Sequence, residues 1–308
     1  MDHDPMRDLP MATFSLDREG PARDRPGRLS ELLGDPDTRV LELSGDRART
    51  KGEALALRAP RPGDLEQLTL HLGSHDGTEY VAVCRPCPEE EGTEASREEQ
   101  LEEAPFASLR RAASGLSELD VALFTTALGL ANWHHRHPRC PRCGNPTEVA
   151  AAGWVRRCPH DGSEHYPRTD PAVIMAVTDA QDRLLLARNV NWPEGRFSVL
   201  AGFVEPGETF AGAVAREVAE ETGVQVADVE FVADQPWPFP ASLMIGCAAR
   251  ATTSEITPQP EEIAEARWFT REEFLSDVAA GRVLTAGRMS IAARLIERWL
   301  GRRLDRLG

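Results

Sequence analysis

The sequence predicts an α/β fold for its C-terminal half, preceded by a small metal-binding module and an N-terminal α+β region. Two apolar segments, Ala172–Val177 and Leu184–Ala187, have the length and composition of buried strands. Turn residues at 179–182 separate them, so we expect a hairpin. A helix bracketed by glycines then follows between Gly202 and Gly223. These two strands and this helix fit a fold that contains both helices and strands.

Residues 1–125 are predicted to form a small α+β region. Alternating apolar segments at Val40–Leu43, Leu68–Leu72 and Tyr80–Val83 predict the strands of a sheet. The segment Glu89–Glu103 is crowded with acids, which is typical of a solvated loop and the beginning of a helix. An origin of this region as a diverged copy of the C-terminal fold stays open.

A linker helix and a zinc ribbon are predicted for residues 126–168, and residues 169–308 carry the α/β fold. The helix is expected over Leu119–His135 and leads into the metal module. A second helix is expected over Ser290–Leu300. Its apolar residues at helical spacing, which predict packing against the core, are Ile291, Leu295, Ile296 and Leu300.

The overall composition limits the class of protein. A chain of 308 residues with 41% hydrophobic residues is long enough for two domains with cores. A formal net charge of −15 disfavours broad adhesion to nucleic acid or anionic lipid, although it leaves room for a local basic patch. No apolar run approaches the length of a membrane span, and the acidic start is unlike a signal peptide. We therefore expect a soluble, cytoplasmic protein with no membrane partner.

Three cysteines indicate a zinc site. Cys140 and Cys143 are spaced as in a zinc knuckle, and Cys158 follows at the distance of the second half of a zinc ribbon. Asp161 stands where such a ribbon has its fourth cysteine. Because a carboxylate can also bind Zn²⁺, the predicted ligands of a structural zinc ion are these three thiolates and Asp161.

Other arrangements of the cysteines stay open. His160 and His165 are close enough in sequence to replace Asp161 as the fourth ligand. Cys84 and Cys87 form a second pair, which would share one metal with the first pair if the two were adjacent. Ordinary reduced thiols, without a metal, are the plainest alternative.

The stretch Gly202–Val224 gathers acids around a loop and a helix. Residues three and four apart share a helix face, so Glu217 lies beside Glu220 and Glu221, and Thr209 is placed to cap the helix. Like charges repel, so the cluster makes sense if a cation lies among the carboxylates, and hard divalent ions favour oxygen ligands. A solvated helix face that binds nothing is the alternative.

This stretch resembles a complete Nudix box. The matching positions are Gly202, Glu208, Arg216, Glu217, Glu220, Glu221, Gly223 and Val224. The resemblance implies an α/β/α sandwich. It also implies Mg²⁺- or Mn²⁺-dependent hydrolysis of a nucleoside diphosphate linked to another group.

A segment rich in proline and aromatic residues follows at Gln235–Ser242, with the sequence QPWPFPAS. Three prolines in five residues exclude an interior strand or helix, so we expect a stiff extended loop that holds Trp237 and Phe239 for stacking on flat rings. A rigid connector with buried aromatics is the alternative. With the box and the zinc module, this segment is similar to the NADH pyrophosphatase subfamily of Nudix hydrolases, whose members also remove NAD caps from RNA. The resemblance covers about residues 140–297.

The resemblance to this subfamily implies a set of site residues. The divalent metal ligands are the carbonyl oxygen of Ala201 and the carboxylates of Glu217, Glu221 and Glu262. The substrate contacts are Tyr166, Phe203, Gln235, Pro236, Trp237, Pro238, Phe239, Pro240, Ala241, Ser242 and Ala292. Among these, Phe203 corresponds to a residue that stacks on nicotinamide and Ala292 to a main-chain contact. The resemblance also implies a homodimer.

The implied reaction is attack of water on the AMP-side phosphorus of NADH or NAD⁺, which releases AMP and nicotinamide mononucleotide. Capped RNA would leave a 5′-monophosphate. Glu220, beside the ligands Glu217 and Glu221, is the candidate general base. Arg216 is expected to orient Glu208 and its neighbours. Hydrolysis of ADP-ribose or a nucleoside diphosphate sugar is an alternative. A catalytically inactive nucleotide sensor is another, which the complete set of carboxylates disfavours.

An RNA partner would be expected to bind through the metal module. Residues 134–170 carry six arginines against four acids, a local positive bias in an acidic chain. Because arginine is the preferred partner of phosphate, Arg156 and Arg157 are candidate RNA contacts. A structural ribbon that braces two domains is an equal alternative.

Overall fold

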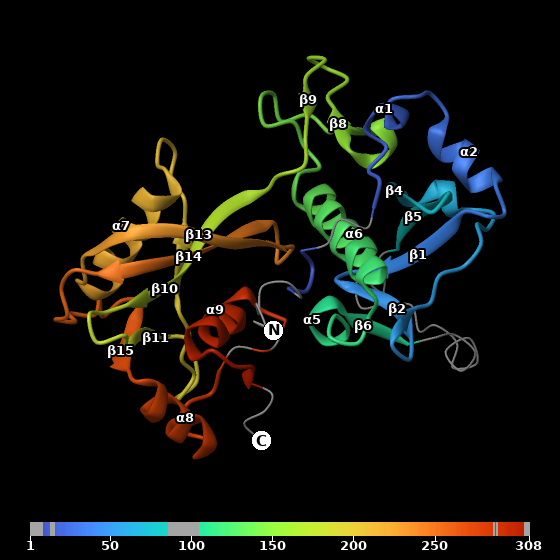
Figure 1. The fold of residues 1–308 in the computed structure, drawn as a ribbon. Coiled ribbons are helices and arrows are strands. Elements are labelled where there is room, and N and C mark those ends of the chain that lie inside the picture. Colours follow the sequence, from blue (N-terminus) through green and yellow to red (C-terminus); the bar gives the residue numbers. More distant parts are fainter. Residues whose placement is uncertain (1–8, 13–15, 86–104, 286, 288, 305–308) are drawn as a thin grey trace. The chain divides into compact units, whose positions relative to one another are not determined.

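The computed structural model describes residues 9–12, 16–85, 105–285, 287 and 289–304 (Figure 1). By its contacts the chain divides into two compact units. The C-terminal unit contains residues 1–10, 170–236 and 242–308, and the N-terminal unit contains residues 11–169 and 237–241. The acidic segment predicted over Glu89–Glu103 lies outside the described residues. In the described part of the chain no helix has the length and hydropathy needed to cross a membrane.

The C-terminal unit is built on a six-stranded mixed sheet. Its strands are β10 (Asp170–Thr178), β11 (Leu184–Asn189), β12 (Leu200–Phe203), β13 (Val226–Trp237), β14 (Ser242–Ala251) and β15 (Ile263–Phe269). The order is β13-β14-β10-β11-β15, and β12 pairs with β10. β10 is parallel to β14 and antiparallel to β11, so the predicted hairpin is confirmed. Its turn is closed by Asp179, whose carboxylate accepts the backbone N–H of Gln181 and Arg183.

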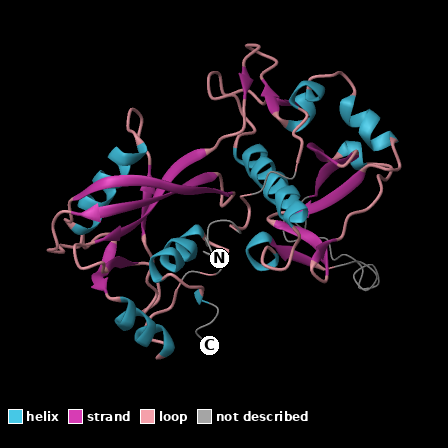
Figure 2. Cartoon of the chain, in the orientation of Figure 1, coloured by secondary structure: helices cyan, strands magenta, loops and turns pink. Residues whose placement is uncertain are grey.

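Helices cover both faces of this sheet, as Figures 1 and 2 show. They are α7 (Phe210–Thr222), α8 (Arg271–Ala279) and α9 (Ile291–Leu300). Alternate residues of β10 and the apolar side of α7 form one core. Its members include Val173, Met175 and Val177 of β10 and Val214 and Val218 of α7. On the other face, a Cβ built on Gly246 of β14 would lie 2.7 Å from Ile291 Cδ1 of α9. The predicted α/β/α sandwich and the predicted C-terminal helix are therefore confirmed.

The N-terminal unit contains a second six-stranded sheet. Its strands are β1 (Arg39–Ser44), β2 (Arg47–Lys51), β3 (Ala54–Leu55), β4 (Leu68–His75), β5 (Thr78–Arg85) and β6 (Phe106–Ser108). The order is β3-β2-β1-β5-β4, with β6 beside β2. The three strands predicted from alternating apolar residues lie within β1, β4 and β5. The short helical segments of this unit are α1 (Gly20–Arg23), α2 (Arg28–Gly34), η1 (Asp64–Glu66) and α5 (Leu109–Ala112).

A long helix, α6 (Glu118–Arg136), packs against β1, β4 and β5 of this sheet. It begins at Ser117, whose hydroxyl accepts the backbone N–H of Asp120, and it confirms the helix predicted over Leu119–His135. Because α6 runs through residues 125 and 126, the division of the chain at that point stays a prediction. After α6 come the elements of the metal module: β7 (Glu148–Ala150), η2 (Ala151–Gly153), β8 (Val155–Arg157) and β9 (Glu164–His165).

The proline-rich segment differs from its prediction at both ends. Strand β13 continues through Gln235 and ends at Trp237, and β14 begins at Ser242. Only residues 238–241 therefore form a loop. β13 is an edge strand of its sheet. A proline at an edge, here Pro236, can leave its missing N–H on the unpaired side, which is why the strand continues through it.

Candidate functional site

Helix α7 presents the acidic cluster, and both of its ends are as the sequence predicts. Thr209 accepts the backbone N–H of Gly212 at 3.1 Å, which caps the first turn. Gly223 ends the helix with a φ of 72°, a left-handed conformation that favours glycine. The caps fix where the helix starts and stops, and therefore which face carries the glutamates.

Glu217 points from α7 onto the backbone of β12. A Cβ built on Gly202 would lie 1.9 Å from the carboxyl carbon of Glu217, so a side chain at position 202 would displace the carboxylate. Burial raises the pKa of Glu217 above its ordinary value, against the opposing effect of the ion pair with Arg216.

Glu221 is the most deeply buried acid of the cluster, with 9% of its surface exposed. Burial, followed by the negative charges of Glu217, Glu262 and Glu220, raises its pKa to about 8. Removing a carboxylate from water beside other carboxylates is unfavourable, and a bound cation would offset that cost. The chemistry of this group therefore fits a divalent ion.

The carboxylates predicted to bind the divalent metal do not converge as tightly as the predicted zinc ligands do. In the described chain, two groups have ligand atoms all within 4.8 Å of one another, Cys140–Cys143–Cys158–Asp161 and Glu19–His71–Glu79. Glu217, Glu221 and Glu262 do not form such a group, although the charge of Glu262 raises the pKa of Glu217 and of Glu221, and the charge of Glu217 raises that of Glu221. This ligand set, implied by the Nudix-box resemblance, therefore stays a prediction.

Arg216 ties the acids of the cluster together. It donates to both oxygens of Glu208 at 2.7 and 2.9 Å, and its Nη1 donates to Glu217 and Glu220 at 2.9 Å each. It also donates to the carbonyl of Phe203. The hydrogen bonds from Arg216 and from the backbone lower the pKa of Glu208 to about 2. Glu208 is thus a fixed anion that holds the guanidinium in place.

Two of the predicted substrate contacts are open to solvent. Phe203, at the end of β12, is 59% exposed, and Tyr166 is 64% exposed. The hydroxyl of Tyr166 donates to Glu164 at 3.1 Å, which restrains the ring. Exposed aromatic rings of this kind are available to stack on a flat ligand.

Gln235 and Ala292 are buried, in contrast. The side-chain amide of Gln235 donates to the carbonyls of Pro10 and Met289 at 2.6 and 2.8 Å, and its oxygen accepts the N–H of Ile291 at 2.9 Å. The N–H of Ala292 donates to the Ser290 hydroxyl. Both residues hold the beginning of α9, and their predicted contact with substrate stays a prediction.

Trp237 and Phe239 pack edge to face, with centroids 5.1 Å apart. The guanidinium of Arg110 lies over both rings. Asn132 on α6 donates to the carbonyls of Pro238 and Pro240. Sequence reasoning missed Arg110 and Asn132, since neither belongs to a motif and both lie more than 100 positions away from their partners.

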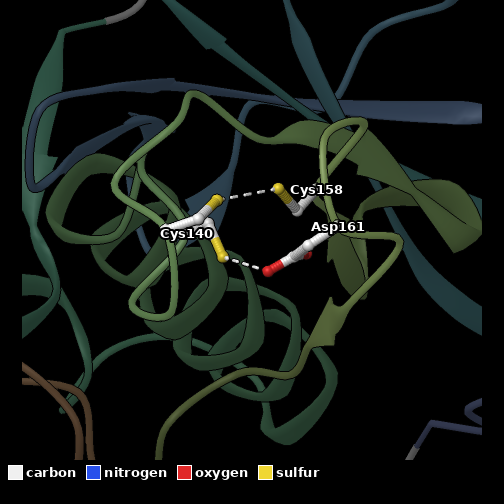
Figure 3. Close-up of side chains that lie close together, drawn as sticks. Cys140, Cys158 and Asp161 are labelled. Atoms are coloured by element: carbon white, nitrogen blue, oxygen red, sulfur yellow. Dashed lines mark hydrogen bonds between the residues drawn. The ribbon is translucent and has the colours of Figure 1, made fainter.

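The predicted zinc ligands converge. The Sγ of Cys140 lies 3.5 Å from Asp161 Oδ2, and the Sγ atoms of Cys143 and Cys158 are 3.5 Å apart. Figure 3 shows Cys140, Cys158 and Asp161 pointing toward one another. Ser163 orients the carboxylate through its N–H and hydroxyl, and these bonds lower the pKa of Asp161. Three thiols and a carboxylate fit a tetrahedral Zn²⁺ site.

The alternative ligand sets find less support. His160 and His165 are absent from the converging group, and His165 interacts with the Ser163 hydroxyl instead. Cys84, the residue before the end of β5, lies outside this group, and burial raises the pKa of its thiol to about 12. Its predicted partner Cys87 lies outside the described residues. Asp161 is therefore the fourth ligand that the geometry favours.

Of the two predicted RNA contacts, Arg156 is a buried structural residue. It is 9% exposed and donates to the hydroxyl and carbonyl of Thr147 and to His134 Nδ1. Burial, with the nearby charge of Arg156, lowers the pKa of His134 to about 4, so this histidine accepts as a neutral ring. Arg157 has an exposed side chain paired with Glu164. Only Arg157 is accessible to a phosphate.

Comparison with family models agrees with these two sites. Residues 135–166 match the NADH pyrophosphatase zinc ribbon domain, and residues 168–286 match the NUDIX domain. The chain contains a Nudix domain. The acidic helix α7 and strand β12, which contains Ala201, lie inside the range that matches the NUDIX domain. The range that matches the zinc ribbon directly precedes it.

Two curated relatives are similar to more than half of this chain. The chain is 47% identical over 186 residues to the NAD-capped RNA hydrolase NudC of Mycobacterium bovis, covering 58% of this chain and 59% of that one. It is 43% identical over 197 residues to the human NAD-capped RNA hydrolase NUDT12, covering 60% and 43%. The matched part is thus less than two thirds of either relative. A crystal structure of a NUDIX hydrolase from Nitrosomonas europaea aligns with a TM-score of 0.43 at 22% identity, over 54% of this chain and 94% of that chain.

Proposed function

We propose that the chain hydrolyses the pyrophosphate bond of NADH and NAD⁺ to nicotinamide mononucleotide and AMP, and that it removes NAD caps from RNA 5′ ends. The observation that carries this proposal is the acidic cluster of the Nudix helix, in which buried Glu221 has a pKa of about 8 beside Glu217. Such a cluster is suited to hold divalent cations against an anionic pyrophosphate. The NAD-specific part is supported by the two relatives named NAD-capped RNA hydrolases and by the match of residues 135–166 to the NADH pyrophosphatase zinc ribbon domain.

Mg²⁺ or Mn²⁺ would be held by the carbonyl of Ala201 and by Glu217, Glu221 and Glu262. All four groups supply oxygen ligands, and hard divalent ions prefer oxygen to softer ligands such as sulfur. When bound, such an ion offsets phosphate charge and makes a bound water more acidic. The zinc ribbon would hold a structural Zn²⁺ through Cys140, Cys143, Cys158 and Asp161.

The protein's own groups position the reaction and move its proton. The water oxygen forms a bond to the AMP-side phosphorus while its proton passes to a carboxylate, and the bond to the bridging oxygen breaks to release nicotinamide mononucleotide. Glu220 is the first candidate base, since it is 59% exposed in its side chain and Arg216 holds one of its oxygens. Glu221 is the second, because a pKa near 8 suits proton transfer at neutral pH.

Substrate recognition would come from the exposed rings of Tyr166 and Phe203 and from the loop that carries Trp237 and Phe239. Flat aromatic surfaces suit the bases of a dinucleotide. We also propose that the chain acts as a homodimer in the cytoplasm. In a reducing compartment such as the cytoplasm, cysteines commonly serve as metal ligands. The converging cysteines of the ribbon are suited to that role.

The test is product identification after incubation of the purified chain with NADH, NAD⁺ and ADP-ribose in the presence of Mn²⁺. Nicotinamide mononucleotide and AMP from NADH, formed faster than AMP from ADP-ribose, would support the proposal. Faster turnover of ADP-ribose would instead indicate a hydrolase of ADP-ribose or nucleoside diphosphate sugars. No turnover of any of the three compounds would favour a nucleotide sensor.

The roles of Glu220 and Glu221 are separated by Gln substitutions at each position, with Glu230→Gln as a control on the exposed surface of β13. Loss of a general base lowers kcat by about 10²- to 10⁴-fold. The base is the residue whose substitution lowers kcat while the Mn²⁺ dissociation constant stays within about threefold of wild type. A substitution that also weakens Mn²⁺ binding identifies a ligand.

A further inference from the structure

The segment Trp237–Ala241, here called the aromatic loop, consists of the last residue of β13 and the loop after it, and belongs by its contacts to the N-terminal unit. It contains two prolines, which lack an N–H and cannot support the loop by donating hydrogen bonds. Asn132 on α6 supplies donors from outside. Its side-chain nitrogen lies 2.9 Å from the carbonyl of Pro238 and 3.3 Å from that of Pro240. One amide group thus joins both sides of the loop's tip.

Arg110 holds the rings of the same loop. Its guanidinium carbon lies 3.9 Å from the centroid of Phe239 and 5.0 Å from that of Trp237. A cation at such distances is attracted to the negative faces of both rings. Because the two rings already meet edge to face at 72°, a cation that contacts both resists rotation of either ring.

The backbone of α6 also lies close to the loop. Pro238 is buried, and a Cβ built on Gly129 would lie 3.9 Å from Pro238 Cβ, an ordinary contact distance. An alanine at position 129 would therefore fit, whereas a longer side chain would meet the proline ring. Asn132 lies on the same side of the helix as Gly129, three residues away, so one helix face supports the loop.

We infer that Asn132 and Arg110 are positioning residues for substrate recognition, and that the N-terminal region serves the reaction by fixing the aromatic loop in its binding conformation. This inference rests on the proposed function, in which the loop recognises a flat ring of the dinucleotide. A loop that is already ordered loses little conformational entropy when substrate binds, so the support lowers KM. Neither residue needs to touch the substrate.

The first experiment measures loop order without substrate, by hydrogen exchange in a peptide that spans residues 230–245. The variants are Asn132→Asp, which keeps the shape but removes the donors, and Arg110→Ala. Arg111→Ala is the matched control, since Arg111 is the next residue on α5 and makes no ring contact with the loop in the described chain. We expect exchange at the amides of Phe239 and Ala241 to be about tenfold faster in Asn132→Asp and unchanged in the control.

The second experiment measures steady-state hydrolysis of NADH by the same variants. We expect KM to rise about tenfold in Asn132→Asp and about three- to fivefold in Arg110→Ala, with kcat within about twofold of wild type. Arg110→Lys keeps the cation and should restore most of the loss. On α6, Gly129→Ala should resemble wild type, while Gly129→Leu should raise KM as Asn132→Asp does.

The two experiments have distinct failures. Unchanged loop exchange in Asn132→Asp and Arg110→Ala would overturn the inference, as would faster exchange with an unaltered KM. A fall in kcat that matches the rise in KM, with no recovery in Arg110→Lys, would indicate general damage and would also overturn it. If wild-type protein does not hydrolyse NADH, the proposed function fails, and the exchange data decide the positioning role by themselves.

Discussion

The carboxylate of Glu217 occupies the space in which any residue other than glycine at position 202 would place its β-carbon. A Cβ built on Gly202 would lie 1.9 Å from the carboxyl carbon and 2.0 and 2.3 Å from the two oxygens. The contact joins β12, whose Ala201 carbonyl is a proposed metal ligand, to α7, which carries the acidic ligands. The position of a side chain proposed to bind metal thus depends on the absence of a side chain on the neighbouring strand.

Gly202→Ala should therefore abolish the proposed hydrolysis of NADH without unfolding the chain. The methyl group would push the Glu217 carboxylate away from β12, and misplacement of a catalytic group by about 1 Å costs on the order of 10²-fold in rate. We expect kcat for NADH hydrolysis to fall at least about 100-fold while the circular dichroism spectrum is retained. Gly34→Ala is the control, since a Cβ there meets nothing within 4 Å. Full activity in Gly202→Ala would contradict the proposed ligand set.

Glu221 should make the stability of the metal-free protein depend on pH. The pKa of Glu221 in the folded chain, about 8, lies above its ordinary value of 4.5. The folded chain then retains a proton that the unfolded chain has lost, so the free energy of unfolding falls as the pH rises from about 4.5 to 8. At about 1.4 kcal/mol for each unit between 4.5 and 8, we expect a loss on the order of 5 kcal/mol.

Urea denaturation in the presence of a chelator at pH 5, 6.5 and 8 measures this dependence. Glu221→Gln has no carboxyl to ionise, so its stability should change less with pH and should exceed that of wild type at pH 8. Glu230→Gln should keep the wild-type slope. Equal slopes in wild type and Glu221→Gln would show that burial does not perturb this acid.

Substitution of Asp161 should change how firmly the ribbon holds zinc. Thiolate binds Zn²⁺ strongly, and a fourth cysteine completes the commonest structural site. We expect zinc release to a chelating dye to be at least about tenfold slower in Asp161→Cys and faster in Asp161→Ala than in wild type. Glu148→Ala, an exposed acid on β7, should behave as wild type. Unchanged release in both Asp161 variants would remove this residue from the ligand set.

The two neighbouring arginines of β8 should respond differently to loss of charge. Arg156→Met would leave buried acceptors on Thr147 and His134 unpaired, which costs about 1–3 kcal/mol for each group. Arg157→Met would break only an exposed ion pair with Glu164, so its effect on the free energy of unfolding should be below about 1 kcal/mol. Urea denaturation of the two variants compares these costs. A similar loss in both would contradict the structural role of Arg156.

Arg157→Glu then becomes the appropriate test of RNA binding, because the fold does not depend on this side chain. Reduced decapping of NAD-capped RNA with unchanged NADH hydrolysis would support a contact between the ribbon and RNA. Equal effects on both substrates, or none, would favour a ribbon that is only structural.

Much of the site could be predicted from the sequence because its signals are local. The acids of α7 are fixed relative to one another by helical spacing, and Thr209 and Gly223 determine where that helix starts and ends. The thiols of Cys140 and Cys143 are held by a short knuckle, which limits where they can point. In both cases a few adjacent residues determine the geometry, so their order along the chain is enough to infer it.

The proline-rich segment shows where such local inference fails. Its prolines predict a loop, yet Pro236 continues β13, because the strand lies at the edge of the sheet and needs no donor there. Whether a strand is an edge strand depends on which strands pair beside it, and that pairing is not encoded in the segment itself.

By itself the sequence determined the acidic helix, its caps, the thiols proposed to bind zinc and the family that these residues resemble, since each depends on neighbours along the chain. Only the tertiary structure decided which of Asp161, His160 and His165 joins the thiols, that Arg156 is buried, and that Asn132 and Arg110 support the aromatic loop. These relationships join side chains from separate elements. Their physical basis is the packing of distant segments and the burial and pairing of charge that packing imposes, which no local pattern specifies.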